Sequence, residues 1–233
     1  MAIWNNALSE HDQNVLEARP SRSSRGLGER PAVLVIDMNC GSVGDDRPNY
    51  QQVDEYPGAC GAFAWMAIPH MKEVIFAARE ADIPFVYTKL IFRATHDLPR
   101  AKDPNYRFSE LSPQSEIQPD IAPQPGDLLI ETQQHSGFCQ TPLLPVLLNK
   151  KVDTLIVIGS STSGCVRATV VDATTYQCFK VAVVEDAVCD SFDISHKSAL
   201  FDLERRYCDV IPANKVIEYF AAVKAAQGET VGV

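Results

Sequence analysis

The sequence predicts an α/β fold, a three-layer, doubly wound structure in which helices cover both faces of a six-stranded, mostly parallel sheet in the order 3-2-1-4-5-6. The chain contains short, continuous apolar runs, which are typical of strands buried on both faces. Segments with apolar residues at helical spacing lie between most of these runs. Strands and helices therefore alternate along the chain, which favours parallel strands joined by helical crossovers.

Six apolar runs are predicted to be the strands. The first, PAVLVID, is continuous and ends in a carboxylate, Asp37. The fourth, DTLIVIG, leads directly into the polar turn SSTSG. In chain order, the predicted strands are residues 31–37, 84–92, 126–131, 153–159, 180–186 and 208–212.

Five segments between and after these strands are predicted to be helices. In the first of them, apolar side chains recur at helical spacing from Ile68 to Ala78. In the second, Thr141 opens the helix and Pro142 occupies its first turn, where a missing backbone N–H is tolerated. In chain order, the predicted helices are residues 66–83, 141–151, 165–177, 194–207 and 214–227.

Residues 31–233 are expected to form one domain behind an N-terminal arm, residues 1–30. A chain of 233 residues with 45% hydrophobic residues can bury one substantial core, and no internal repeat divides it. The arm contains a stretch rich in Ser, Gly and Pro and is expected to hold at most one short helix. Residues 93–125 are polar, proline-rich and aperiodic, which is typical of a lid or a binding segment.

Composition argues against several classes of protein. The net charge of −9, without a concentrated basic face, argues against nucleic acid binding. No apolar stretch approaches the length of a membrane span, and acidic residues stand where a signal peptide would be basic, so we expect a cytoplasmic protein that binds no membrane. The seven cysteines show no CxxC or Cys/His metal spacing and are interpreted as reduced thiols.

Cys165 stands at the junction between the fourth strand and the following helix. If the strand order is 3-2-1-4-5-6, strands one and four are neighbours, and Asp37 and Cys165 meet at the carboxyl edge of the sheet. The positive end of a helix favours a thiolate, and its backbone N–H groups can stabilise an oxyanion. Gly164 leaves room for a substrate, and Asp37 could take and return the proton of the thiol.

Simpler interpretations of these residues remain open. A single cysteine after a strand is often a small buried hydrophobic residue, and a lone aspartate can cap a helix or anchor a loop. The segment GSSTSG also resembles half of a phosphate-binding loop, but Cys165 and Val166 occupy the positions of its Lys and Ser or Thr. Nucleotide binding is therefore not expected.

The segments PAVLVIDMN and DTLIVIGSSTSGCVRATVVDATTYQCFKVAVVEDAVCD together resemble the isochorismatase-like cysteine hydrolases, within them the N-carbamoylsarcosine amidohydrolase branch. The resemblance implies Cys165 as the nucleophile, Asp37 as the general acid and base, and an oxyanion hole from the backbone N–H groups of Ser161 and Cys165. It also implies a non-proline cis peptide between Ser160 and Ser161, with Ser160 and Gly164 lining the substrate site. Such hydrolases act through an acyl-enzyme, without a cofactor, as homodimers or homotetramers.

One residue of the family pattern is absent. The family's catalytic lysine follows the third strand, and the matching stretch here, IETQQHSGFCQT, places Thr132 on that catalytic position. Gln133 stands beside it and is a candidate for binding the substrate. Lys89, at the end of the second strand, could supply an amine from the neighbouring strand, or it could be a surface lysine with only its stem packed. His135 could be a charged or neutral partner of the thiol, or simply a solvated loop residue.

The substrate is expected to be a small amide, carbamoyl or imide-like compound. Four side chains could line its pocket, or could equally serve packing or the surface: Tyr87, Arg93, Phe108 and Phe138. Arg167 could instead anchor a carboxylate such as Asp172 or one at a subunit contact. Some nicotinamidase relatives hold zinc with one Asp and two His, but RATHDLPRAKD has one histidine, so no metal is expected.

Three functions compete at this point. The first is a cysteine-dependent hydrolase of a non-peptide C–N bond. The second is a degenerate relative that keeps the fold and binds a small ligand but has lost turnover together with the lysine. The third is a vinyl-ether hydrolase of the isochorismatase type, which is less favoured because those relatives generally lack the cysteine.

Overall fold

The computed structural model of the chain describes residues 2–19, 23–93 and 108–230 and contains the expected sheet. Every strand pair is parallel, and the order is β3-β2-β1-β4-β5-β6, so the predicted topology is confirmed. The strands are β1 (Pro31–Ile36), β2 (Phe85–Leu90), β3 (Leu128–Thr132), β4 (Thr154–Ser160), β5 (Lys180–Cys189) and β6 (Asp209–Ile211). Strands β1, β2 and β4 follow the expected ranges closely, and β5 continues three residues beyond its expected end at residue 186.

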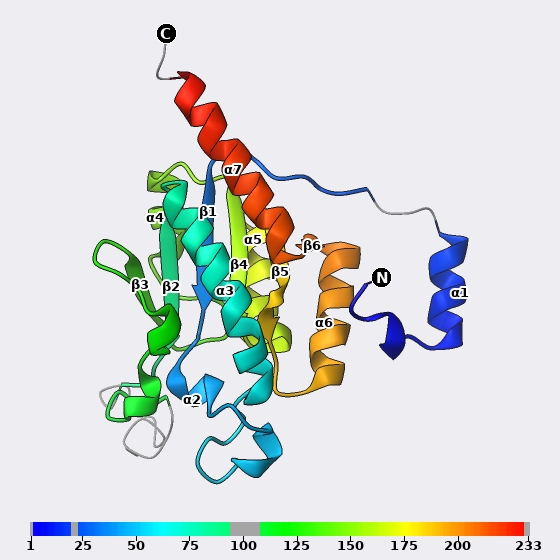
Figure 1. Cartoon of the computed structure of the whole chain (residues 1–233), viewed down its shortest axis with the longest axis vertical. Coiled ribbons are helices and arrows are strands. Elements are labelled where there is room, and N and C mark those ends of the chain that lie inside the picture. The colour runs from blue at the N-terminus through cyan, green and yellow to red at the C-terminus, as the bar shows by residue number, and fades with distance from the viewer. Residues whose placement is uncertain (1, 20–22, 94–107, 231–233) are drawn as a thin grey trace.

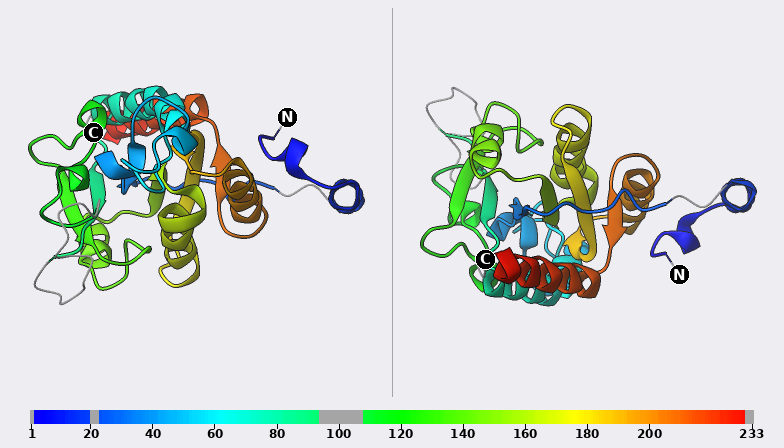
Figure 2. Two further views of the ribbon diagram at one scale, coloured as in Figure 1. Left: turned by 90° about the horizontal axis from the view of Figure 1, so that it is seen from below. Right: turned by 90° about the horizontal axis from the view of Figure 1, so that it is seen from above.

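Helices cover both faces of this sheet, as Figures 1 and 2 show. One face carries α3 (Ala62–Glu80) and α7 (Ala213–Thr230). The other face carries α4 (Leu143–Asn149), α5 (Arg167–Thr175) and α6 (Asp193–Arg206). Within the described ranges, no helix combines the length and the apolar character that a membrane span requires.

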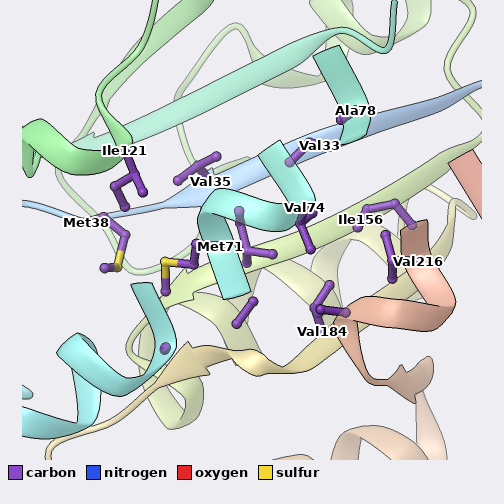
Figure 3. Close-up of a cluster of buried hydrophobic side chains, with 14 of the residues drawn as sticks. Val33, Val35, Met38, Met71, Val74, Ala78, Ile121, Ile156, Val184 and Val216 are labelled. Carbon is purple, nitrogen blue, oxygen red and sulfur yellow. The ribbon is translucent and has the colours of Figure 1, made fainter. Parts of the chain in front are cut away.

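The core consists of two apolar clusters, one on each side of the sheet. In β1, Val33 and Val35 belong to the cluster under α3 and α7, whereas Leu34 and Ile36 belong to the cluster under α4, α5 and α6. Figure 3 shows the first cluster, in which Met71 of α3 lies over the strands. Because successive side chains of a strand point to opposite faces, a strand covered on both sides must be apolar throughout.

Several short elements differ from the expectation. The segment after β1, expected to be a loop, contains a one-turn helix α2 (Cys40–Val43) and a 3-10 turn over Asn49–Gln51. Helix α3 begins four residues earlier than expected, and Ala64 in this added turn is fully buried. Within 108–125, 3-10 turns form at Pro113–Ser115 and Pro119–Ile121, while residues 94–107 of the expected lid lie outside the described residues.

The N-terminal arm contains the short helix expected there, α1 (Glu10–Ala18), which begins with a capping box formed by Ser9 and Asp12. This helix buries no side chain and lies away from the sheet in Figure 1. Several contacts hold the arm to the rest of the chain, among them the Trp4 ring, which meets Phe201 edge-on at 6.2 Å, the hydrogen bonds that Asp209 accepts from residues 24–26, and the ion pair between Arg30 and Asp153. The division into an arm and one domain stays a prediction.

Candidate active site

Asp37 and Ser160 stand side by side at the carboxyl edge of the sheet. Strands β1 and β4 pair along their whole length, up to Ile36 opposite Gly159. Gly159 has φ +120°, and a Cβ atom built there would lie 2.2 Å from the carbonyl oxygen of Ile36. The absence of a side chain at this position therefore lets the two strand ends approach closely, and the Ser160 hydroxyl donates to the carbonyl oxygen of Asp37 at 3.1 Å.

The Asp37 side chain is held in a buried position with three polar neighbours. Its residue is 3% exposed, and Thr88 on β2 donates a hydrogen bond of 2.6 Å from its hydroxyl to the carboxylate. Burial raises the pKa of Asp37 to about 6, against the opposing effects of hydrogen bonds from Thr88 and Cys165 and of the charge of His135. The carboxyl group can therefore exchange a proton near neutral pH, as an acid–base catalyst must.

The turn after β4 contains the expected cis peptide between Ser160 and Ser161, which confirms that implication of the resemblance. Cys165 lies in a kinked turn over Thr162–Val166 that directly precedes α5, and Gly164 within this turn has a non-helical backbone conformation (φ −104°, ψ −105°). The turn is narrow at Gly164, since a Cβ atom there would lie 2.5 Å from the Ser161 hydroxyl oxygen. A side chain at position 164 would therefore require the Ser161 hydroxyl to move.

Two side chains from later segments of the chain hold the turn over Thr162–Val166 in place. Asp190, which follows β5, accepts hydrogen bonds from both the backbone N–H and the hydroxyl of Ser163, each at 2.7 Å. His196 on α6 lies with its Nδ1 atom 2.8 Å from the Thr162 hydroxyl oxygen. Both partners come from distant segments of the chain, so the position of Cys165 depends on the packing of β5 and α6 as well as on its own strand.

The Cys165 side chain is 6% exposed and belongs to the cluster under α4, α5 and α6, yet it has polar partners. It lies close enough to the Asp37 carboxyl group to lower the pKa of that group, and its Sγ atom lies 3.6 Å from Nδ1 of His135. A thiol placed only as a hydrophobic residue would have neither contact. The arrangement can move a proton between sulfur and carboxylate.

Lys89 does not join this group. Its neighbour Thr88 points to Asp37, and because side chains alternate along a strand, Lys89 points to the opposite face of the sheet. There its ammonium group forms an ion pair with Glu116 at 2.8 Å. The suggestion that Lys89 supplies the missing amine to Cys165 is therefore not supported by the geometry.

Replacing Lys89 by Met is expected to leave the chemical reactivity of Cys165 within about twofold of the unmodified protein, because sites with no shared partners act independently. The measurement is the rate at which iodoacetamide alkylates the Cys165 peptide, followed by mass spectrometry. Glu116→Gln is the matched control, since it removes the same ion pair without touching the strand. A large loss of Cys165 reactivity in Lys89→Met, but not in Glu116→Gln, would show that Lys89 does act on Cys165.

Thr132 and Gln133, the residues at the aligned position of the family lysine, have different surroundings. Thr132 ends β3 and is 2% exposed, and its hydroxyl oxygen has no hydrogen-bond partner among the residues that the structure describes. Alternation from Ile130 places its side chain on the same sheet face as Cys165. Gln133 is exposed.

The residues considered for substrate binding are mostly engaged elsewhere. Arg93 forms ion pairs with Glu110, at 3.1 Å, and with Glu131. Phe138 stacks on Phe179 with 6.3 Å between ring centroids, in the cluster under α4 and α5. Their binding roles stay predictions, although the contacts of both residues are those of packing and surface pairing.

Three further residues also have contacts other than those considered. Tyr87 is fully buried on the opposite face of the sheet, beneath α3, and Phe108 is 7% exposed. Arg167 pairs with Asp202 of α6 at 3.3 Å rather than with Asp172. Within the described ranges, no three His, Cys, Asp or Glu side chains are grouped to hold a metal ion, and His96 lies outside those ranges.

The comparisons with known proteins agree with this fold. The isochorismatase domain family matches residues 31–215, and the chain belongs to this family. It is 31% identical to maleamate amidohydrolase from Pseudomonas putida over 195 residues, which cover 80% of this chain and 84% of the relative. It is 27% identical to N-carbamoylsarcosine amidase from an Arthrobacter species over 222 residues, which cover 92% of this chain and 80% of the relative.

Solved structures show the same architecture. A cysteine hydrolase from Pseudomonas syringae pv. phaseolicola superimposes with a TM-score of 0.73 at 23% identity, covering 88% of this chain and 99% of that one. N-carbamoylsarcosine amidase from Thermoplasma acidophilum superimposes with a TM-score of 0.62 at 25% identity, covering 79% of this chain and 97% of that one. The resemblance seen in the sequence is thereby confirmed at the level of family and fold.

Proposed function

We propose that this protein is an amidohydrolase that cleaves a non-peptide C–N bond in a small amide, carbamoyl or imide-like compound. The observation that carries the proposal is the placement of the Cys165 thiol beside the buried Asp37 carboxyl group, whose pKa burial raises to about 6 while the thiol lowers it. The two named relatives, a maleamate amidohydrolase and an N-carbamoylsarcosine amidase, support this class of substrate. Action without a cofactor or metal and assembly as a homodimer or homotetramer are parts of the same proposal.

In the first half of the reaction, Asp37 accepts the proton of the Cys165 thiol, and the sulfur attacks the carbonyl carbon of the substrate. A C–S bond forms, and the carbonyl oxygen becomes an oxyanion. The C–N bond then breaks as Asp37 returns the proton to the leaving nitrogen, which departs as ammonia or an amine. A thioester remains on Cys165.

In the second half, water attacks the thioester carbon. Asp37 accepts a proton from this water and passes it to the departing sulfur, so that the carboxylic acid product leaves and the thiol is restored. The net change is the addition of one water molecule across the C–N bond. A carboxyl group with a pKa of about 6 suits both directions of proton transfer near neutral pH.

Stabilisation of the oxyanion is assigned to the backbone N–H groups of Ser161 and Cys165. The kink at Gly164 gives this segment a backbone course that differs from a regular helix start. Asp190 and His196 hold the turn in place through Ser163 and Thr162, which favours preorganised donors. Gly164 and Ser160 border the same segment.

The test is a screen of small amides and carbamoyl compounds, including maleamate and N-carbamoylsarcosine, for release of ammonia or amine. Intact-mass spectrometry follows whether an acyl adduct forms on Cys165. We expect turnover by the unmodified protein and by the matched control Cys139→Ser, an exposed thiol, and none by Cys165→Ser. Turnover in Cys165→Ser would overturn the proposed nucleophile.

Absence of both turnover and adduct across the panel would favour the degenerate ligand-binding relative, because Thr132 stands where the family has lysine. Cleavage of a vinyl ether that does not require Cys165 would instead favour the isochorismatase type of reaction. Each result separates one of the three functions from the others.

A further inference from the structure

The candidate site lacks a fixed cation from β3, since Thr132 carries no charge. A nucleophilic thiolate beside a carboxylate needs positive charge nearby, because two adjacent anions otherwise raise each other's proton affinity. Lys89 pairs with Glu116 on the other face of the sheet and does not meet this need. The loop after β3, however, brings one titratable group to the sulfur, with His135 Nδ1 at 3.6 Å from Cys165 Sγ.

We propose that His135 is a catalytic residue of this site and that its imidazolium ring supplies the positive charge which stabilises the Cys165 thiolate. This inference rests on the proposed function. The Nδ1–H group donates to the thiolate and keeps its proton, while the proton of the thiol moves to Asp37 as described above. The ring acts as a charged hydrogen-bond donor to the reacting sulfur and takes no part in the proton balance of the reaction.

The position of His135 is fixed by the same helix that follows the cysteine. The hydroxyl of Ser136 donates to Asp172 at 2.5 Å, and the backbone N–H of Gly137 donates to the Thr169 hydroxyl at 2.9 Å. Thr169 and Asp172 lie three residues apart in α5 and therefore share one face of that helix. The residues directly after His135 are thus attached to the element that begins just beyond Cys165.

The absence of a side chain at Gly137 allows this attachment. A Cβ atom there would lie 3.3 Å from side-chain atoms of both Thr88 and Leu143 and 3.6 Å from Thr169, so the loop follows the sheet edge closely. Thr88 is the residue that donates to Asp37. The loop therefore contacts both Thr88, which holds Asp37, and α5, the helix that follows Cys165.

Two anionic groups lie near the ring or the residue that follows it. Asp37 approaches from the end of β1, and its ionisation is favoured by the charge of His135. Asp172 of α5 lies beyond Ser136, and Cys165 precedes the same helix. His135 itself is exposed.

The test measures alkylation of Cys165 by iodoacetamide, resolved by peptide, in unmodified protein and in His135→Gln. At pH 6.5 we expect the rate to fall about tenfold or more in the variant, because loss of an adjacent cation shifts a thiol toward its protonated form. The double variant Thr132→Lys/His135→Gln restores a cation from the aligned family position and should recover much of the rate. His70→Gln, on α3, is the matched control and should leave the rate unchanged.

The dependence on pH distinguishes a charged ring from a merely structural one. An imidazole changes its charge near neutrality, whereas an ammonium group does so several pH units higher. We expect the unmodified protein to keep a shoulder of reactivity below neutral pH, His135→Gln to lose that shoulder, and the double variant to regain it. A His135→Gln profile that overlays the unmodified one would overturn the inference.

This inference and the proposed function can fail separately. Alkylation needs no substrate, so it tests His135 even if no amide is turned over. Full amide turnover by His135→Gln, with Cys165 still required, would leave the proposed function intact and remove His135 from it. Circular dichroism and a second neutral replacement, His135→Asn, guard against a folding artefact, and equal losses in both variants with native spectra are the expected result.

Discussion

Replacing Asp37 by Asn is expected to stabilise the folded protein at pH 8 and, at the same time, to reduce turnover by a factor of about 10² to 10⁴. The loss follows because an amide can neither accept the proton of the thiol nor return it to the leaving group. The gain in stability follows because Asp37 is buried and its ionisation is disfavoured in the folded state. The Thr88 hydroxyl can still donate to the side-chain oxygen of an asparagine.

The way in which the stability of the folded protein changes with pH follows from the raised pKa of Asp37. Between an unfolded value near 3.9 and the folded value of about 6, the folded chain holds a proton that the unfolded chain has released. Stability contributed by this group therefore falls as pH rises through that range and stays low above it. The difference corresponds to about 2–3 kcal/mol, so Asp37→Asn should gain this much at pH 8 and almost nothing at pH 4.

Urea unfolding at the two pH values measures this effect. Asp82→Asn is the matched control, because Asp82 has φ +53°, close to the +45° of Asp37, but is exposed. The control isolates the preference of asparagine for positive φ, which does not depend on pH. An equal gain at pH 4 and pH 8 in Asp37→Asn would show that the backbone, and not ionisation, is responsible.

Replacing Gly159 by Ala is expected to destabilise the protein by about 3 kcal/mol or more, as overpacking against an immovable neighbour does. The added methyl group would lie 2.2 Å from the carbonyl oxygen of Ile36, a backbone atom in the central strand β1. Both strands are paired on each side, so neither can move without breaking further hydrogen bonds. Since Ile36 precedes Asp37 and Gly159 precedes Ser160, any displacement also alters the candidate site.

Urea denaturation of Gly159→Ala alongside Gly126→Ala separates the two causes of this loss. Gly126 has φ +100° but open space around the position of a Cβ atom. It should therefore show only the conformational penalty of a positive φ, about 1–2 kcal/mol. If the two variants lost equal stability, steric contact with Ile36 would not be the explanation.

The two variants change residues at the same place in the fold, where the ends of β1 and β4 meet. Gly159 lets β1 and β4 approach closely, which contributes to stability and positions the strand ends. Asp37, placed by that approach, is held in an environment that disfavours its charge. The first feature stabilises the fold, and the second reduces stability where a proton must be exchanged, a combination that is common at catalytic sites.

The sequence by itself determined the strands, their parallel order and the meeting of Asp37 with Cys165. Local patterns suffice here, because a strand buried on both faces must be apolar throughout, and a doubly wound sheet brings the ends of its first and fourth strands together. The cis peptide at Ser160–Ser161 followed from the resemblance to the family and is present.

Only the tertiary structure decided which groups surround the thiol. Lys89 and His135 were both open candidates, and the structure pairs Lys89 with Glu116 while it brings His135 to the sulfur. The kinked turn around Cys165 and the ion pairs of Arg93 were likewise not predicted from the sequence. These features depend on contacts between loops and helices far apart in the chain, and hydrophobic periodicity, which records only which face of an element is buried, carries no information about them.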